Sequence, residues 1–167
     1  RGAPAINQAA IEAIPSFAGQ GYQVIVATGR VHYDELRQSL KEELPANVRL
    51  VPYIDNMPSL LRQIKLVVGR SGATSLTELT ALGLPSILVP SPYVTNNHQE
   101  HNAMALVDHG AARMIKQADL TATSLVETIQ ELMADPENLE KMAQSAYELG
   151  IRDASDRLVK VLEEICK

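Results

Sequence analysis

Aromatic residues and cysteine are scarce in this chain of 167 residues. There is no Trp and only one Phe, and aromatic residues make up 4% of the sequence. A core of aliphatic residues and Met suits helices packed on a sheet better than an aromatic-rich β-barrel. The single Cys, Cys166, excludes a disulfide framework, so we expect a reducing compartment, the cytoplasm.

The sequence also lacks concentrated positive charge and long apolar runs. Its formal net charge is −5, whereas a protein that binds a phosphate backbone needs clustered Lys and Arg. We therefore expect no nucleic acid partner. No apolar stretch has the length that spans a bilayer. A length of 167 residues with 46% hydrophobic content is typical of one globular domain with a substantial core.

The clearest functional pattern lies at residues 66–78. Residues 66–68 are apolar and mostly β-branched, which is typical of a buried parallel strand. The segment 69–72 then brings Gly and Ser, which let another group approach the backbone closely. From Ser75 onward the apolar spacing becomes helical, with one face formed by Leu76, Leu79 and Leu82. The pattern predicts a strand, a short loop and a helix.

A helix that begins directly after such a loop favours phosphate binding. Its first backbone N–H groups are free, and the positive end of the helix dipole lies at the same place. Glu78 falls about one turn inside the predicted helix, where it can accept hydrogen bonds from ribose hydroxyls. A plain strand-to-helix connection is the alternative, and the spacing alone does not separate the two.

Strands and helices alternate as far as residue 115, and the remainder is helical. We expect strands at 22–28, 48–54, 66–68, 86–89 and 112–115. We expect helices at 6–17, 32–44, a short one from Pro58, one from Ser75, one at 100–107, and three that follow Thr121, Asp135 and Asp153. The last helix carries an apolar face of Leu158, Val161, Leu162 and Ile165. This alternation predicts a parallel sheet with helices on both faces.

Ligands of such sheets bind at the carboxyl ends of the strands. That edge gathers four parts of the chain, each of which directly follows a predicted strand. They are Gly29, Ile54, the segment 69–78 and the polar segment 91–99.

Four motifs then occur in the order and at the spacing of one enzyme family. They are Tyr53-Ile54-Asp55-Asn56-Met57, Arg70-Ser71-Gly72-Ala73 with Thr77-Glu78, Gly83-Leu84-Pro85, and His98-Gln99 followed by Asn102-Ala103. By these motifs the chain resembles the C-terminal half of the MurG family. These bacterial transferases add N-acetylglucosamine to undecaprenyl-diphospho-muramoyl-pentapeptide in peptidoglycan synthesis. The resemblance implies a two-domain glycosyltransferase of the GT-B type, whose Rossmann-like, doubly wound domain would span residues 1–167.

The resemblance also implies a site for UDP-N-acetylglucosamine. Ile54 would meet the uracil through its backbone, Glu78 would bind the ribose hydroxyls, and Gln99 would contact hydroxyls of the sugar. The residues expected to wrap the nucleotide sugar are Ala73, Thr74, Ser75, Leu76, Thr77 and Glu78. Secondary candidates are Arg70, Ser71, Gly72, His98 and Asn102. Arg70 could neutralise a phosphate or form a structural pair, and the sequence leaves both open.

Two features of the family are missing from this sequence. The family's first strand, with its Gly-Gly-Ser turn, would come immediately before Arg1. Because that strand is central in the Rossmann order, we expect a break in the sheet between 22–28 and 66–68 unless other residues fill it. The N-terminal domain is also absent. The resemblance places the acceptor site, the catalytic base and the contact with the cytoplasmic face of the membrane there. We therefore expect no catalytic residue in this chain and no transfer by it alone.

We expect neither a metal nor another cofactor. His98 and His101 lie close together, but a zinc site needs a third or fourth ligand, and no Asp-x-Asp clamp is present. In the implied reaction, a hydroxyl of the lipid-linked muramoyl group attacks the anomeric carbon with inversion, and UDP leaves. Two alternatives are a stand-alone donor subunit of a split transferase and a GT-B sugar-nucleotide epimerase.

Overall fold

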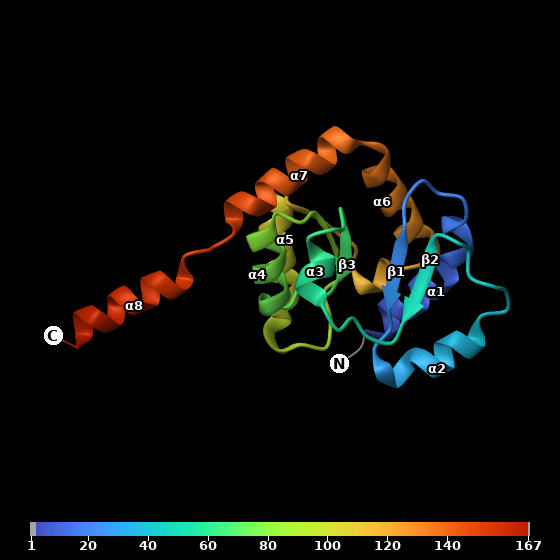
Figure 1. Cartoon of the computed structure of the whole chain (residues 1–167), viewed down its shortest axis with the longest axis horizontal. Helices are drawn as coiled ribbons and strands as arrows, with labels where there is room; N and C mark the ends of the chain where they lie inside the picture. The colour runs from blue at the N-terminus through green and yellow to red at the C-terminus, as the bar shows by residue number, and fades with distance from the viewer. Residues whose placement is uncertain (1–2, 167) are drawn as a thin grey trace.

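Short strands and helices alternate as far as residue 114, and helices alone follow within residues 3–166, the part of the chain that this computed structural model describes (Figure 1). The strands are β1 (Val24–Ala27), β2 (Val48–Val51), β3 (Val67–Gly69), β4 (Ser86–Leu88) and β5 (Ala112–Met114). The α-helices are α1 (Pro4–Ala13), α2 (Arg30–Ser39), α3 (Met57–Leu61), α4 (Ala73–Leu82), α5 (His98–Asp108), α6 (Ala122–Ala134), α7 (Pro136–Leu149) and α8 (Ala154–Ile165). Three 3₁₀ turns are η1 (Ile14–Phe17), η2 (Thr95–Asn97) and η3 (Gln117–Asp119).

The strands form two parallel sheets instead of one. β1 pairs with β2, and β3, β4 and β5 pair in that order. No ladder joins β1 to β3 among the described residues. Val67 and Val68 of β3 are only half-buried, whereas Ile87 and Leu88 of β4 are fully buried, as expected if β3 is an edge strand that pairs on one side alone. The expected break between the strands at 22–28 and 66–68, which are β1 and β3 in the structure, is confirmed.

Helices cover both faces of the three-stranded sheet. On one face, Leu88 packs with Leu79 of α4 and Leu106 of α5. On the other face, Ile87 packs with Leu132 of α6 and Met142 of α7. This arrangement confirms the predicted doubly wound, parallel α/β architecture.

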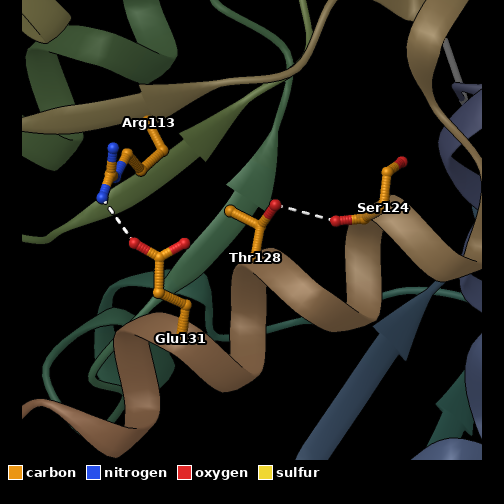
Figure 2. Close-up of polar contacts among 4 residues, drawn as sticks. All are labelled: Arg113, Ser124, Thr128 and Glu131. Carbon is orange, nitrogen blue, oxygen red and sulfur yellow. Dashed lines mark hydrogen bonds and ion pairs between the residues drawn. The ribbon is translucent and has the colours of Figure 1, made fainter.

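Helix α6 connects the two sheets. Its Val126 packs with β1 and β2, its Leu132 packs under β4, and Ile129 contacts both clusters. Figure 2 shows α6 beside β5, with Arg113 of β5 paired to Glu131 at 2.6 Å. The Thr128 hydroxyl in the same view donates to a backbone carbonyl one turn earlier in α6. Because both partners of the ion pair are exposed, the packing of α6 contributes more than this pair does.

The N-terminal ends of α6 and α7 follow the predicted signals. The Thr121 hydroxyl accepts from the Ser124 N–H, and the Ser124 hydroxyl accepts from the Thr121 N–H. The two bonds complete a capping box. The Asp135 carboxylate accepts from the N–H of Asn138, and Pro136 occupies the first helical position. These two helix starts are confirmed.

Several predicted boundaries are wrong. Helix α2 ends at Ser39, five residues before the predicted end, because Leu40 adopts an extended backbone and packs, with Leu44, against the β1–β2 cluster. Helix α4 begins at Ala73, earlier than predicted. Strand β2 ends at Val51, since Pro52 has no N–H to continue a ladder. Leu82 lies on the expected face of α4 but is 38% exposed.

Helix α8 extends away from the rest of the molecule (Figure 1). Its apolar residues are half to three-quarters exposed, with Val161 at 49% and Ile165 at 74%. Asp153 precedes the helix as predicted, but its carboxylate pairs with Arg157 instead of capping a backbone N–H. Among the described residues, no helix combines the length and apolarity needed to cross a bilayer.

Truncating Leu132 tests how far the fold depends on α6. Leu132 is fully buried, so Leu132→Ala is expected to lower the free energy of unfolding by about 2–5 kcal/mol. Leu158→Ala on α8, where the side chain is 60% exposed, is the matched control and should change it by less than about 0.5 kcal/mol. Urea denaturation measures both, and equal losses would contradict the described packing.

Candidate functional site

The carboxyl ends of the strands lie around the start of α1. The Asn7 amide donates to the carbonyl of Thr28 at 2.8 Å, directly after β1. The preceding residue, Ile6, packs against the apolar cluster that contains Val89 after β4, and Val68 of β3 packs against the same cluster. The segments that follow β1, β3 and β4 therefore lie at one end of the fold, as the sequence predicts. Asn7 was not singled out from the sequence, because a lone Asn among apolar helix residues gives no signal of its buried partner.

The first turn of α4 presents unpaired backbone donors. The chain leaves β3 at Gly69, and Gly72 is the N-cap of α4 with no side chain capping it. The N–H groups of the first helical residues have no intrahelical acceptor, since such bonds begin with Leu76 donating to the Gly72 carbonyl at 3.0 Å. Ala73, Thr74 and Ser75 are exposed in this turn. The geometry suits an anion at the positive end of the helix dipole.

Of the remaining candidate residues on α4, two have exposed side chains and one has a buried side chain. Glu78 and Thr77 are exposed, and the Thr77 hydroxyl donates to the Ala73 carbonyl at 3.0 Å. Leu76 instead buries its side chain with Leu61 and Leu79. Only the backbone of Leu76 is therefore near the exposed face, whereas Glu78 presents a free carboxylate there.

Ile54 lies in the loop between β2 and α3 and is half-buried. Within residues 3–166, no backbone hydrogen bond engages its peptide N–H or C=O. The Asn56 side chain caps the next helix by accepting from the Ser59 N–H at 3.1 Å, which fixes where the loop ends. Leu61 of that helix belongs to the same buried cluster as Leu76, so the helix that follows the loop packs with α4.

Two hydrogen bonds join Ser71 to Gln99 and Asn102. Ser71 is fully buried, and its hydroxyl donates to the Gln99 carbonyl at 2.7 Å. The Asn102 amide donates back to the Ser71 carbonyl at 3.1 Å. These bonds tie the loop after β3 to the first turns of α5. The structure thus brings together three of the residues that the sequence predicts as candidates for the site.

The Gln99 side chain is held in one orientation. Its Oε1 accepts from the Ser91 N–H at 3.0 Å, so the NH₂ group of the amide faces the opposite way. Within the described residues, no hydrogen bond engages that NH₂ group. His98, beside it, is exposed, and its Nδ1 lies 3.0 Å from the Thr95 carbonyl.

The loop before α5 is conformationally unusual. Asn96 and Asn97 both have positive φ, +54° and +51°, a region in which side chains other than Gly are uncommon. The Asn97 amide donates to Glu100 at 2.6 Å and thereby fixes the turn that leads into α5. Asn is among the residues that adopt this region most readily, which suits it to both positions.

Arg70 makes three internal hydrogen bonds. Its Nη1 donates to the carbonyls of Val89 and Pro90 at 3.0 and 3.1 Å, and its Nη2 donates to Gln117 Oε1 at 2.6 Å. Burial lowers the pKa of Arg70 from its ordinary value, and the group stays charged at neutral pH. These contacts favour a structural role for Arg70 over the neutralisation of a phosphate. Gln117 could not be identified from the sequence as a partner of Arg70, because the two residues lie 47 positions apart.

A pocket of about 370 Å³ lies beside the Arg70 contacts and is lined among others by Tyr93, Glu100, Lys116 and Gln117. Lys116 pairs with Glu100 at 2.7 Å, and its hydrogen bond, together with the one from Asn97, lowers the pKa of Glu100. The same contact raises the pKa of Lys116. Nowhere in residues 3–166 do three His, Cys, Asp or Glu side chains gather as metal ligands would.

Lys116→Met tests this ion pair. Without the ammonium group, the pKa of Glu100 is expected to rise towards its ordinary value, which NMR titration of the carboxyl group measures. Because the folded-state pKa is lowered, the ionised carboxylate stabilises the fold above the ordinary pKa of Glu, and that contribution is lost as pH falls through the lowered value. An unchanged Glu100 titration would show that the pair does not form in solution.

The sequence matches a known family and several curated proteins. A family model described as the glycosyltransferase family 28 C-terminal domain matches residues 1–158. A protein of Lactiplantibacillus plantarum is 51% identical over 168 residues, and one of Bacillus cereus is 49% identical over 168 residues. Both are named UDP-N-acetylglucosamine–N-acetylmuramyl-(pentapeptide) pyrophosphoryl-undecaprenol N-acetylglucosamine transferases. Each alignment covers 100% of this chain and 46% of the relative, so the chain spans about half their length.

Solved structures agree with these matches. The crystal structure of MurG from Acinetobacter baumannii aligns with a TM-score of 0.85 and 27% identity, over 98% of this chain and 47% of that one. The glycosyltransferase VinC aligns with a TM-score of 0.70 over 92% of this chain and 37% of its own. At 22% identity, that second likeness shows the shared fold alone.

Proposed function

The chain belongs to the glycosyltransferase family 28 C-terminal domains, and we propose that it binds UDP-N-acetylglucosamine for an inverting glycosyltransferase. The observation that carries the proposal is the uncapped first turn of α4, which follows β3, whereas Ile54 follows β2 and Gln99 follows β4. A nucleotide sugar has its diphosphate between its base and its sugar. In the proposal, Ile54 takes the base, the first turn of α4 takes the diphosphate, and Gln99 takes the sugar.

Backbone groups would hold the base and the diphosphate. The free peptide N–H and C=O of Ile54 offer a donor and an acceptor, as the edge of a uracil ring requires. The N–H groups of Ala73, Thr74 and Ser75 would receive phosphate oxygens, with Gly72 allowing close approach. No residue of this site needs a metal to fulfil its role in the proposal.

Glu78 would hold the ribose. Its carboxylate is exposed about one turn into α4 and has no protein partner among the described hydrogen bonds. An ionised carboxylate accepts two hydroxyl hydrogen bonds, which matches the two adjacent hydroxyls of a ribose. The free carboxylate and the free N–H groups of α4 thus lie on one helix, at a spacing that a nucleoside diphosphate spans.

Gln99 and Asn102 would recognise the sugar. Gln99 presents an amide NH₂ group, because its Oε1 is already bound. Asn102 presents its amide oxygen, because its NH₂ group donates to Ser71. Together they offer one donor and one acceptor in fixed positions, which suits hydroxyl groups that both give and receive hydrogen bonds.

For the whole protein we propose the activity named for the relatives, transfer of N-acetylglucosamine to an N-acetylmuramyl-(pentapeptide) pyrophosphoryl-undecaprenol acceptor. An acceptor hydroxyl attacks the anomeric carbon as the bond to the diphosphate breaks, the hydroxyl proton passes to a base outside this chain, and UDP leaves. The dipole of α4 would stabilise the charge that develops on the diphosphate. Acceptor binding and contact with the cytoplasmic face of the membrane would belong to the part of the protein outside this chain.

Calorimetric titration with UDP-N-acetylglucosamine tests the donor site. Glu78→Ala is expected to weaken binding about 10- to 100-fold, because it removes charge-assisted hydrogen bonds worth about 1.5–3 kcal/mol. Glu140→Ala on α7 is the matched control, since Glu140 is also an exposed helical Glu but lies away from the site. UDP-glucose, which lacks the N-acetyl group, should bind more weakly than UDP-N-acetylglucosamine.

Absence of binding would call for one further titration. The same experiment on a longer polypeptide, which includes the segment that precedes this chain, separates an incomplete sheet from a wrong assignment. If the longer form also fails to bind UDP-N-acetylglucosamine, the donor-site proposal is wrong. An equal loss in the Glu140→Ala control would show that the effect of Glu78→Ala is not local.

We expect the 167-residue chain by itself to bind donor without transferring sugar. The proposed site contains groups that bind the donor but no side chain placed to take the proton from an acceptor hydroxyl. Incubation with radiolabelled UDP-N-acetylglucosamine and a lipid-linked acceptor should yield no labelled lipid. Measurable transfer by the chain alone would place the catalytic base within it.

A further inference from the structure

One peptide group in this fold is bound at both of its ends. The carbonyl of Pro90 accepts from Arg70 at 3.1 Å. The N–H of the next residue, Ser91, donates to Gln99 Oε1 at 3.0 Å. The C=O and the N–H belong to a single peptide unit, so the guanidinium of Arg70 and the amide of Gln99 are connected through one rigid plane.

The geometry of that plane couples the two contacts. A trans peptide unit is flat, and its C=O and N–H point in opposite directions. Rotation of the unit would move both ends together. When Arg70 holds the oxygen, it therefore also fixes the direction of the Ser91 N–H, which in turn orients the Gln99 amide. A cation on the oxygen also polarises the unit and strengthens its N–H as a donor.

Three acceptors define the position of the Arg70 side chain. Val89 and Pro90 offer successive carbonyls to Nη1, and Gln117 offers its Oε1 to Nη2 at 2.6 Å. Because the guanidinium is planar, holding both of its terminal nitrogens fixes the plane of the group. Gln117 comes from η3, after β5, so the contact joins the ends of three neighbouring strands.

We propose that Arg70 and Gln117 are positioning residues for sugar recognition, acting on Gln99 through the Pro90–Ser91 peptide unit. This inference rests on the proposed donor site, and it assigns Arg70 a role other than phosphate binding. We call the set Arg70, Gln117, Val89, Pro90 and Ser91 the peptide clamp. The clamp sets which end of the Gln99 amide faces the sugar.

The orientation of the amide decides what Gln99 can recognise. With Oε1 held by Ser91, the NH₂ group is presented as a donor to a sugar oxygen. If the clamp opens, the amide can turn by half a rotation and present its oxygen instead. The site would then lose its preference for one arrangement of sugar hydroxyls, while the nucleotide part of the site on α4 would be unaffected.

Two conservative variants separate positioning from charge. Arg70→Lys keeps the positive charge, but a single ammonium cannot reproduce the planar fork that reaches Val89, Pro90 and Gln117. Gln117→Leu keeps Arg70 and removes only the acceptor of its Nη2. Arg113→Lys is the matched control, because Arg113 also donates at 2.6 Å to a side chain but lies at the exposed contact between β5 and α6.

The measured quantity is the ratio of dissociation constants for UDP-N-acetylgalactosamine and UDP-N-acetylglucosamine, which differ in the orientation of one hydroxyl. Titrations use the full-length protein, with UDP alone as the reference for the nucleotide part. Arg70→Lys and Gln117→Leu are each expected to reduce the ratio about tenfold, the value of one hydrogen bond, and to leave UDP affinity unchanged. Arg113→Lys should leave both quantities unchanged.

A second readout does not depend on any ligand. The Ser91 amide should exchange its proton with solvent more than about tenfold faster in both clamp variants, as measured by NMR, because its acceptor is no longer held in place. This measurement also shows whether the variants are folded, since the amides of β4 and α6 should stay protected.

The outcomes distinguish the two proposals. If Arg70→Lys lowers UDP affinity and Gln117→Leu does not, Arg70 contacts phosphate and the clamp is wrong. The clamp is equally wrong if both variants keep the wild-type ratio and the wild-type exchange rate at Ser91. If the wild-type protein binds neither nucleotide sugar, the donor site itself fails, and the role assigned to the clamp fails with it.

Discussion

Side-chain packing, not backbone hydrogen bonding, holds the two sheets of this fold together. No ladder joins β1 to β3 within residues 3–166, so helices connect the halves, above all α6 through its buried Val126 and Leu132 and its partly buried Ile129. Hydrophobic contact is non-directional and depends on volume and shape, whereas a ladder fixes register. The relative placement of the halves therefore depends on how closely these side chains fill the space between them.

The proposed site spans the same division. Ile54 follows β2 of the two-stranded sheet, whereas α4 and Gln99 follow strands of the three-stranded sheet. A ligand that binds all three would contact both halves, and its binding free energy would add to the packing that holds them together. Helix α1 joins the two halves at the edge where the ligand would lie. Its Asn7 donates to Thr28 after β1, and its Ile6 packs against the apolar cluster of the three-stranded sheet.

Much of this arrangement could be predicted from local pattern. The strand, loop and helix around residues 66–82, the starts of α6 and α7, and the alternation that gives a parallel fold all depend on neighbouring residues. The break in the sheet was also predictable, since the resemblance located a strand outside the sequence. The end of α2 was not, because Leu40 and Leu44 leave the helix to pack against strands that the helical pattern does not contain.

The sequence by itself determined which segments form strands and helices, where α6 and α7 begin, and which loops meet at the carboxyl edge. These outcomes follow from spacing, capping and turn residues within a few positions of one another. Only the tertiary structure decided that Arg70 donates to two carbonyls and to Gln117, and that the Ser71 hydroxyl donates to the Gln99 carbonyl. It also decided that α8 leaves its apolar face exposed. Each of those outcomes depends on groups 19 to 47 residues apart, or on a packing partner, and a hydrogen bond forms only where folding brings its two ends within about 3 Å.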